Sequence, residues 1–425
     1  MPSETASRLI ENELLNDGDP ARNLGTFVTT RMPPTPESLI LQTLPKNIAN
    51  NESYPATTDI QRKCVDMVAH LFHVPSSFSS PEQDATGTTT AGSSEAILLA
   101  VLALKLRWLS RRSSSSPTEQ PNLILSSAAH ICWAKACLYF SILPRYVPLI
   151  PPNLTLSPEA AISLVDSNTI GIVTILGTTH TGEYEPTFSL NSLLVSSKLD
   201  IPIHVDAASG GFVAPFLTPS LVWDFRLEKV VSINVSGHKY GLVYAGLGFI
   251  IWRSPEYLPK EMVMKMNYLG NPHQKTVTLN FSRGASHVVA QYYNLLSLGF
   301  DGYKNVMTDL TKIADLLADR IEDMGGFLVL SKRNGEGLPL VAFRLDDSIT
   351  TRRFNEFDVA QELTRQGGWM VPAYTLAPNA EMINVLRVVV RQDFGVEQCS
   401  EFVEDLRMVM KRLNDSSFGS DKGIF

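Results

Sequence analysis

Cysteine is scarce in this chain. Four cysteines occur in 425 residues, at positions 64, 132, 137 and 399, which is too few and too scattered for a disulfide framework. Cys132 and Cys137 have no second pair of ligands at the spacing of a zinc site, so we expect no bound metal. Small buried thiols in a reducing compartment account for this pattern.

Positive charge is not in excess either. The 36 Lys and Arg residues are outnumbered by 43 Asp and Glu, which gives a formal net charge of −7 without any basic block. The long-range field of such a chain repels a nucleic-acid backbone, so we expect no nucleic-acid partner.

Long apolar runs are also missing. The longest, residues 96–104, ends at Lys105 and falls far short of the roughly 18 residues that a membrane span requires. Residues 1–18 mix charged side chains with single apolar ones, which is typical of neither a signal peptide nor a transit peptide. We therefore expect no membrane anchor and a cytoplasmic protein.

Hydrophobic residues make up 44% of the chain, enough for a large core spread over two or three domains of about 150 residues. Short β-branched runs alternate with helix-like stretches; the predicted strands are residues 123–125, 170–176, 201–206, 230–235 and 247–252. This alternation predicts an α/β fold with a mainly parallel sheet, and ligands at the carboxyl ends of the strands.

The pattern changes after about residue 300. Helices are predicted at 307–324, 358–366 and 396–413, and strands at 327–330, 338–345 and 385–390. We therefore expect an N-terminal segment (1–21), a large domain (22–310) and a small C-terminal α+β domain (311–425). Residues 110–121, rich in serine and proline, are predicted to form an exposed loop.

Residues 92–95, Gly-Ser-Ser-Glu, follow a threonine-rich turn and open an apolar stretch of good helix formers. Free backbone N–H groups at a helix start, together with the hydroxyls of Ser93 and Ser94, make a site for phosphate. The alternative is an ordinary serine N-cap.

Two predicted strands end in residues that can carry chemistry. One ends at Asp206 and is followed by small residues, so that something flat can approach the backbone there; this Asp could equally cap the next helix. The other ends in Ser-Gly-His-Lys, residues 236–239. Poor solvation after a buried strand would lower the pKa of Lys239 and make its amine a nucleophile towards a carbonyl, although most single lysines are surface residues.

A phosphate cradle, a strand-end Asp and a downstream Lys are together what pyridoxal 5'-phosphate needs. Lys239 would bind the aldehyde covalently, and Asp206 would keep the pyridine nitrogen protonated so that the ring accepts electrons. Ala208 is small enough for the ring to lie on.

Six stretches of the sequence resemble glutamate decarboxylase of the bacterial and plant type, a fold type I pyridoxal-phosphate enzyme. They are TGTTTAGSSEA, DAASGG, SGHK, NFSRG, WMVPAYTLAPNAE and YPATTDIQRKCVDMVAHLF, and the similarity runs from about residue 10 to residue 394. The resemblance implies a large domain on a seven-stranded sheet, a small C-terminal domain, and at least a homodimer with active sites at the subunit interface.

The same resemblance implies roles for individual residues. Phosphate would be bound by Ser93 and Ser94, by Ser236 and His238, and by Ser282 reaching across from the other subunit. Thr179 would lie near the cofactor, and His130 would stack on the ring face opposite Ala208. Without the resemblance, His130 would be read as a core histidine on a strand-end loop.

Arg387 lies among β-branched residues of a predicted strand. Burial of a guanidinium is costly without an anion to pair with it, and the resemblance implies that this anion is the substrate α-carboxylate, bound bidentately. The alternative is an edge strand on which Arg387 and Arg391 both face solvent.

The chain also departs from the family. Asn50 replaces an aspartic acid that, with Thr26 and Phe27, contacts the side-chain carboxylate of glutamate; an amide can still donate to a carboxylate. His130 replaces a glutamine and Ala134 a histidine. The loop at 271–275 is one residue longer and different in composition. The resemblance implies that the proton for Cα comes from Lys239 or from a residue of the 268–276 loop. Residues 414–425 lack the tryptophan-containing basic helix of calmodulin-regulated members, so we expect no calmodulin binding.

The leading hypothesis is therefore a decarboxylase that converts L-glutamate to 4-aminobutanoate and carbon dioxide, with Lys239, Asp206 and His130 as catalytic residues. The second is a related enzyme that acts on another amino acid, or directs the carbanion to condensation or oxidative deamination. A third, a scaffold protein without activity, is disfavoured by the intact Lys239 and Asp206.

Overall fold

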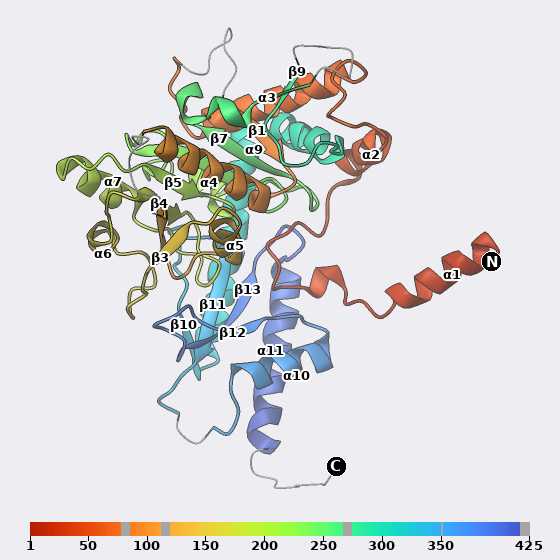
Figure 1. Ribbon diagram of the computed structural model, residues 1–425. Helices are drawn as coiled ribbons and strands as arrows, with labels where there is room; N and C mark the ends of the chain where they lie inside the picture. Colours follow the sequence, from red (N-terminus) through yellow and green to blue (C-terminus); the bar gives the residue numbers. More distant parts are fainter. Residues whose placement is uncertain (78–85, 112–119, 267–273, 350–351, 417–425) are drawn as a thin grey trace.

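The computed structural model describes residues 1–77, 86–111, 120–266, 274–349 and 352–416. The predicted loop at 110–121 and the loop at 268–276 lie largely outside these residues. Figure 1 shows a large α/β body, a smaller C-terminal part below it, and a terminal helix, α1 (Ser3–Leu14), that projects from the body.

A seven-stranded sheet forms the centre of the large body. Its strands lie in the order β1-β7-β6-β5-β4-β2-β3, and β7 alone runs antiparallel to its neighbours. In chain order they are β1 (Gly87–Thr90), β2 (Asn122–Ser126), β3 (Leu143–Val147), β4 (Thr169–Ile175), β5 (Ile203–Asp206), β6 (Val230–Ser236) and β7 (Gly248–Trp252). The predicted mainly parallel α/β sheet is confirmed.

Both faces of this sheet are covered because its buried strands are apolar on both sides. Leu123, Leu125 and Val173 pack in a cluster with helices α4 (Ser93–Ser110) and α5 (Ile131–Tyr139), whereas Ile124 and Ile172 belong to the main cluster on the other face. The remaining helices of the body are α2 (Pro34–Thr43), α3 (Pro55–Leu71), α6 (Pro158–Ser163), α7 (Thr187–Ser196) and α8 (Ala214–Leu217).

A second sheet, antiparallel throughout, forms the C-terminal part. Its order is β10-β11-β13-β12, with β10 (Phe327–Val329), β11 (Leu340–Leu345), β12 (Ala373–Thr375) and β13 (Asn384–Val389), and it is accompanied by α10 (Glu356–Gly367) and α11 (Val396–Ser416). Arg387 lies on β13, an inner strand, so the alternative of an edge strand is wrong.

The two parts are joined by one long helix. α9 (Ser286–Asp323) is interrupted at Gly299, whose φ of 58° is left-handed backbone, and the predicted division at residue 310 falls within its second half. This division between domains stays a prediction. A short antiparallel ribbon of β8 (Met264–Met266) and β9 (Gln274–Thr276) precedes α9.

No helix in the described part of the chain is long and apolar enough to cross a bilayer.

Candidate active site

A cavity of about 410 Å³ opens where the parallel strands of the large sheet end. β1 leads into Gly92 and α4, β2 into Ala128 and His130, and β4 into Gly177. The parallel topology therefore collects residues from five strand ends at one place. Among the lining residues are nine that the sequence singled out: Ser93, Ser94, His130, Thr179, Asp206, Ala208, Ser236, His238 and Lys239.

Lys239 lies just after β6, with its Nζ 3.0 Å from the hydroxyl oxygen of Ser209. Burial lowers the pKa of this lysine, and Arg387 adds to that effect while Asp206 opposes it. Its backbone is fixed by Thr29, whose hydroxyl donates to the Lys239 carbonyl over 2.9 Å. A buried amine of lowered pKa suits attack on an aldehyde.

Three donors surround the carboxylate of Asp206 at the end of β5. Trp133 Nε1–H donates to Oδ2 over 2.8 Å, while Asn234 Nδ2 and the Ala208 N–H donate to Oδ1 over 2.9 Å and 3.2 Å. None of these donors carries a charge, so the negative charge of Asp206 remains available to a cation in the cavity. A protonated ring nitrogen is such a cation.

The phosphate cradle is formed where α4 begins at Ser93. No side chain caps this helix, and the hydroxyl oxygens of Ser93 and Ser236 lie 2.8 Å apart. A Cβ atom at Gly92 would approach His238 Cε1 to 2.9 Å, so only glycine fits between the helix start and that ring. Uncapped N–H groups and two hydroxyls are the donors that a phosphate group requires, and they fit pyridoxal phosphate.

His130 is the N-cap of α5 and contacts a thiol that the sequence did not single out. Its Nδ1 lies 3.0 Å from Cys132 Sγ, which is also 2.8 Å from the Ser94 hydroxyl oxygen. The hydrogen bond to Cys132 raises the pKa of His130. Burial raises the pKa of the Cys132 thiol, but the hydrogen bonds from His130 and Ser94 outweigh burial, and the net shift is downward.

Arg387, on β13, lines a groove beside the cavity and contacts Thr179, one of the residues of the cavity wall. It is 7% exposed, and its guanidinium lies 4.6 Å from the ring of Phe27 and 5.5 Å from that of Tyr374. One terminal nitrogen donates to the carbonyl of Thr179 and the other, over 2.7 Å, to that of Gly25. Its buried Nε has no partner within the described part of the chain, so this donor is free for an anion.

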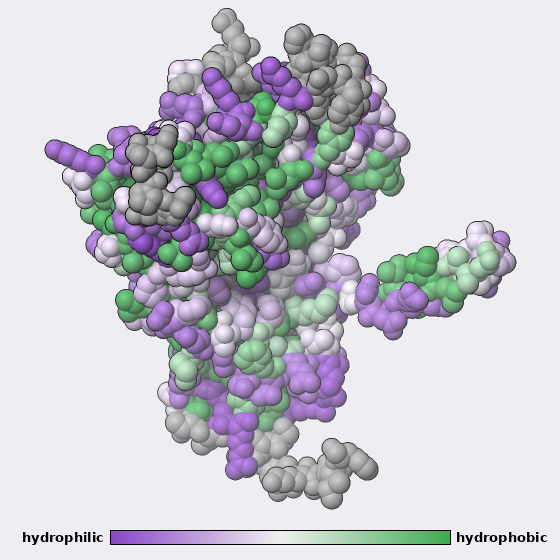
Figure 2. All heavy atoms as spheres, in the orientation of Figure 1, coloured by the Kyte–Doolittle hydropathy of each residue, from purple (hydrophilic) through white to green (hydrophobic). Residues whose placement is uncertain are grey.

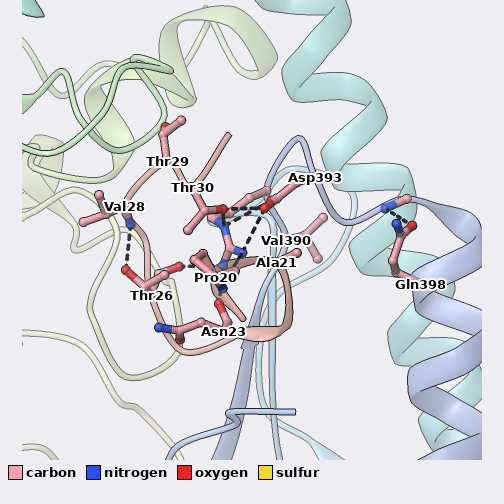
Figure 3. Close-up of polar contacts among 12 residues, drawn as sticks. Pro20, Ala21, Asn23, Thr26, Val28, Thr29, Thr30, Val390, Asp393 and Gln398 are labelled. Carbon is pink, nitrogen blue, oxygen red and sulfur yellow. Dashed lines mark hydrogen bonds and ion pairs between the residues drawn. The ribbon is translucent and has the colours of Figure 1, made fainter. Parts of the chain in front are cut away.

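Thr26 and Phe27 belong to residues 20–30, a segment that lies beside Val390 and Asp393, just after the end of β13 (Figure 3). The Arg391 guanidinium donates to the carbonyls of Asn23 and Thr26 over 2.6 Å and 3.1 Å, and Arg391 is only 4% exposed. The expectation that Arg391 could face solvent is therefore wrong. Phe27 lies 5.4 Å from Lys239 Nζ, and Thr26 lines a groove with Arg387.

Asn50 and Ser282 do not line this cavity. They lie near each other on another surface, where the Ile48 N–H donates to the Arg283 carbonyl over 2.9 Å and Asn47 donates to the Ser282 hydroxyl over 3.1 Å. Asn50 itself accepts from the Ser53 N–H over 3.2 Å. Within one chain, therefore, both residues lie outside the lining of the cavity beside Lys239.

Sequence reasoning missed the residues that hold Asp206. Asn234 is opposite Asp206 in the register of β5 and β6, and is completely buried. A signal was present, since Ser232, Asn234 and Ser236 alternate with Ile233 and Val235 and so place a polar row on one face of a buried strand. Trp133 gave no such signal, because nothing in its local sequence indicates the contact with Asp206.

Comparison with known proteins agrees with this geometry. Residues 5–346 match the family model described as the pyridoxal-dependent decarboxylase conserved domain. The chain is 47% identical to a glutamate decarboxylase of Solanum lycopersicum over 97% of its length and 82% of the relative's. It is 40% identical to glutamate decarboxylase beta of Listeria innocua, over 97% and 88% of the two chains.

The fold is shared with solved structures. Glutamate decarboxylase of Lactobacillus brevis superposes with a TM-score of 0.91 at 39% identity, over 97% of this chain and 93% of the other. Oryza sativa TDC, solved with PLP and tryptamine, superposes with a TM-score of 0.81 over 98% of this chain and 88% of the other; at 17% identity that likeness concerns the fold alone.

Proposed function

Because this chain belongs to the family of pyridoxal-dependent decarboxylases, we propose that it removes the α-carboxylate of L-glutamate, giving 4-aminobutanoate and carbon dioxide. The observation that carries the proposal is the arrangement of three groups: the buried amine of Lys239 and the carboxylate of Asp206, which both line the cavity, and Arg387, whose guanidinium donates to the carbonyl of the lining residue Thr179. Relatives that are glutamate decarboxylases support the choice of substrate.

Bound pyridoxal 5'-phosphate supplies an electron sink for the bond that breaks. Residues of this chain hold that group: Lys239 through its amine, Asp206 through the proton on the ring nitrogen, and the start of α4 through the phosphate. His130 and Ala208 line the cavity between these contacts and would lie on either face of the ring. Thr179 lines the cavity beside Arg387, which donates to its carbonyl.

Arg387 would orient the substrate. Its Nε–H and the free hydrogens of its terminal nitrogens can bind the α-carboxylate, while Phe27 and Tyr374 hold the guanidinium plane. After carbon dioxide has left, Lys239 Nζ can deliver a proton to Cα, because its amine is buried, lines the cavity and has a pKa below that of an ordinary lysine.

We infer that the active protein is a homodimer and that each subunit contributes Asn50 and Ser282 to the cavity of its partner. The support is that these two residues share one surface and lie apart from the cavity of their own chain. Apolar side chains near that surface are exposed, among them Leu41, Leu44 and Phe281. Helix α1 also presents an uncovered apolar side, with Leu9 and Ile10 exposed (Figure 2).

We place the protein in the cytoplasm, because its four cysteines are all free thiols, as a reducing compartment allows.

A decisive test of the substrate and outcome is incubation of the holoenzyme with each amino acid while carbon dioxide and the organic product are both measured. We expect glutamate to give equal amounts of carbon dioxide and 4-aminobutanoate. Carbon dioxide without the amine would indicate condensation or oxidative deamination instead, and no turnover of glutamate would contradict the choice of substrate. The histidine at 130 and the asparagine at 50 motivate that comparison.

Replacing Asn50 with aspartate should shift selectivity towards glutamate, because the resemblance to glutamate decarboxylases implies an aspartic acid at this position. An ionised aspartate only accepts and would repel the side-chain carboxylate of glutamate, so we expect the gain in acidic solution, where the introduced carboxyl is protonated and donates to that side chain. One hydrogen bond to a charged group is then worth roughly a tenfold change in the ratio of kcat/KM for glutamate to that for glutamine. The matched control is Asn51→Asp, which adds the same charge one residue away, where Asn51 accepts from the Thr58 hydroxyl over 3.2 Å. Equal ratios in both variants would remove Asn50 from the substrate site.

A further inference from the structure

A row of buried polar groups that do not line the cavity leads away from Asp206. Asn234 Nδ2 donates to Asp206 Oδ1 over 2.9 Å, and Asn234 Oδ1 lies 2.7 Å from His204 Nε2. His204 Nδ1 in turn lies 2.7 Å from the hydroxyl oxygen of Ser232. His204 and Asn234 are completely inaccessible to solvent, and Ser232 is 1% exposed.

The hydrogen positions in this row follow from Asp206. An ionised carboxylate only accepts, so Asn234 must turn its NH₂ group towards Asp206 and its oxygen towards His204. His204 Nε2 must then carry the hydrogen. Burial lowers the pKa of His204 to about 4, so the ring is neutral, and its Nδ1 accepts from the Ser232 hydroxyl.

His204 also contacts the other arm of the site. Its ring meets that of Trp133 edge to face, with centroids 5.2 Å apart and planes at 63°, and Trp133 donates to Asp206 Oδ2. One histidine therefore touches both side chains that hold the two oxygens of Asp206. A histidine that served only to complete its own hydrogen bonds in the core would not need to contact both Asn234 and Trp133.

We propose that His204 is a positioning residue that, through Asn234 and Trp133, holds the carboxylate of Asp206 in the orientation that faces the coenzyme's ring nitrogen. Its Nε2–H fixes the orientation of the Asn234 amide. Without that donor the amide is free to turn its oxygen towards Asp206, where two acceptors would repel each other, and the carboxylate would then stabilise a protonated ring nitrogen less well. The inference rests on the proposed function, because it presumes that pyridoxal phosphate binds beside Asp206.

The test uses holoenzyme reconstituted with pyridoxal phosphate labelled with ¹⁵N in the ring, and records the nitrogen signal by NMR. In the wild type we expect the signal of a protonated nitrogen. His204→Phe keeps a flat ring beside Trp133 but removes the donor, so the signal should move towards that of unprotonated pyridine. Each unit by which the pKa of the ring nitrogen falls below the pH of the assay lowers the protonated fraction, and with it the rate of decarboxylation, about tenfold.

His204→Gln keeps an N–H donor for Asn234 and should restore both the nitrogen signal and most of the turnover. The matched control is Ser232→Ala, equally buried in the same row, which removes the contact at Nδ1 and leaves the Nε2–H bond in place. We expect its nitrogen signal to equal that of the wild type.

An unchanged nitrogen signal in His204→Phe would overturn the inference while leaving the proposed function intact. If that variant does not fold, Asn234→Ala should show the same displacement, and an unchanged signal there would equally overturn the inference. A wild-type protein that binds no coenzyme at all would instead contradict the proposed function, and the inference with it.

Discussion

Lys239→Ala is expected to abolish decarboxylation, lowering turnover by roughly 10³-fold or more, because the chain loses both its nucleophilic amine and its proton donor. The yellow absorption of lysine-bound coenzyme should vanish in the same variant. Steady-state kinetics and an absorption spectrum of the reconstituted protein measure the two effects.

Lys229→Ala is the matched control for this experiment. Lys229 lies immediately before β6, as Lys239 lies after it, but it pairs with Glu228 over 3.1 Å and is not among the residues that line the cavity. Its replacement should leave colour and turnover unchanged. Turnover and colour retained in Lys239→Ala would mean that another lysine carries the coenzyme.

Arg387→Lys should lose about 10² to 10³-fold in kcat/KM while the coenzyme stays bound. Lysine keeps the positive charge but replaces a planar fork by a point charge, and two charge-assisted hydrogen bonds to the α-carboxylate account for a loss of this size. The lysine side chain also loses the hydrogen bonds that the Arg387 guanidinium donates to the carbonyls of Thr179 and Gly25.

The control for Arg387→Lys is Arg365→Lys on α10, where the arginine pairs with Glu362 at the surface and should tolerate the change. An absorption spectrum establishes that both variants hold the coenzyme equally. If Arg387→Lys decarboxylates glutamate at the wild-type rate, Arg387 does not bind the α-carboxylate.

The sequence predicted those parts of the site that are local. Asp206 ends one buried strand, Lys239 follows another, and Ser93 begins a helix. Each of these motifs is therefore next in the chain to the element that positions it. Parallel topology then brings the strand ends together, which is why nine of these residues line one cavity.

The contacts that sequence reasoning missed join distant parts of the chain. Arg391 holds residues 20–30 from more than 360 positions away, and Trp133 meets Asp206 from a helix that precedes β4 and β5. Such contacts depend on how layers pack, which periodicity does not reveal. The alternating polar residues of β6 are visible in the sequence. That His204 is their hydrogen-bond partner follows only from the register between β5 and β6.

In the proposed homodimer, Asn50 and Ser282 would reach the cavity of the partner subunit, and neither lines the cavity within one chain. Because the two residues share one surface, we expect both contributions to be lost together: a monomeric form of the protein should lack the contacts that Asn50 and Ser282 provide.

The most direct test of the account is to reduce the holoenzyme with borohydride, digest it, and locate the pyridoxyl group by mass spectrometry. We predict that the group is found on the peptide containing Lys239, at its ε-nitrogen. A pyridoxyl group on a different lysine, or on none, would contradict the assignment of the cavity as the coenzyme site and the chemistry built on it.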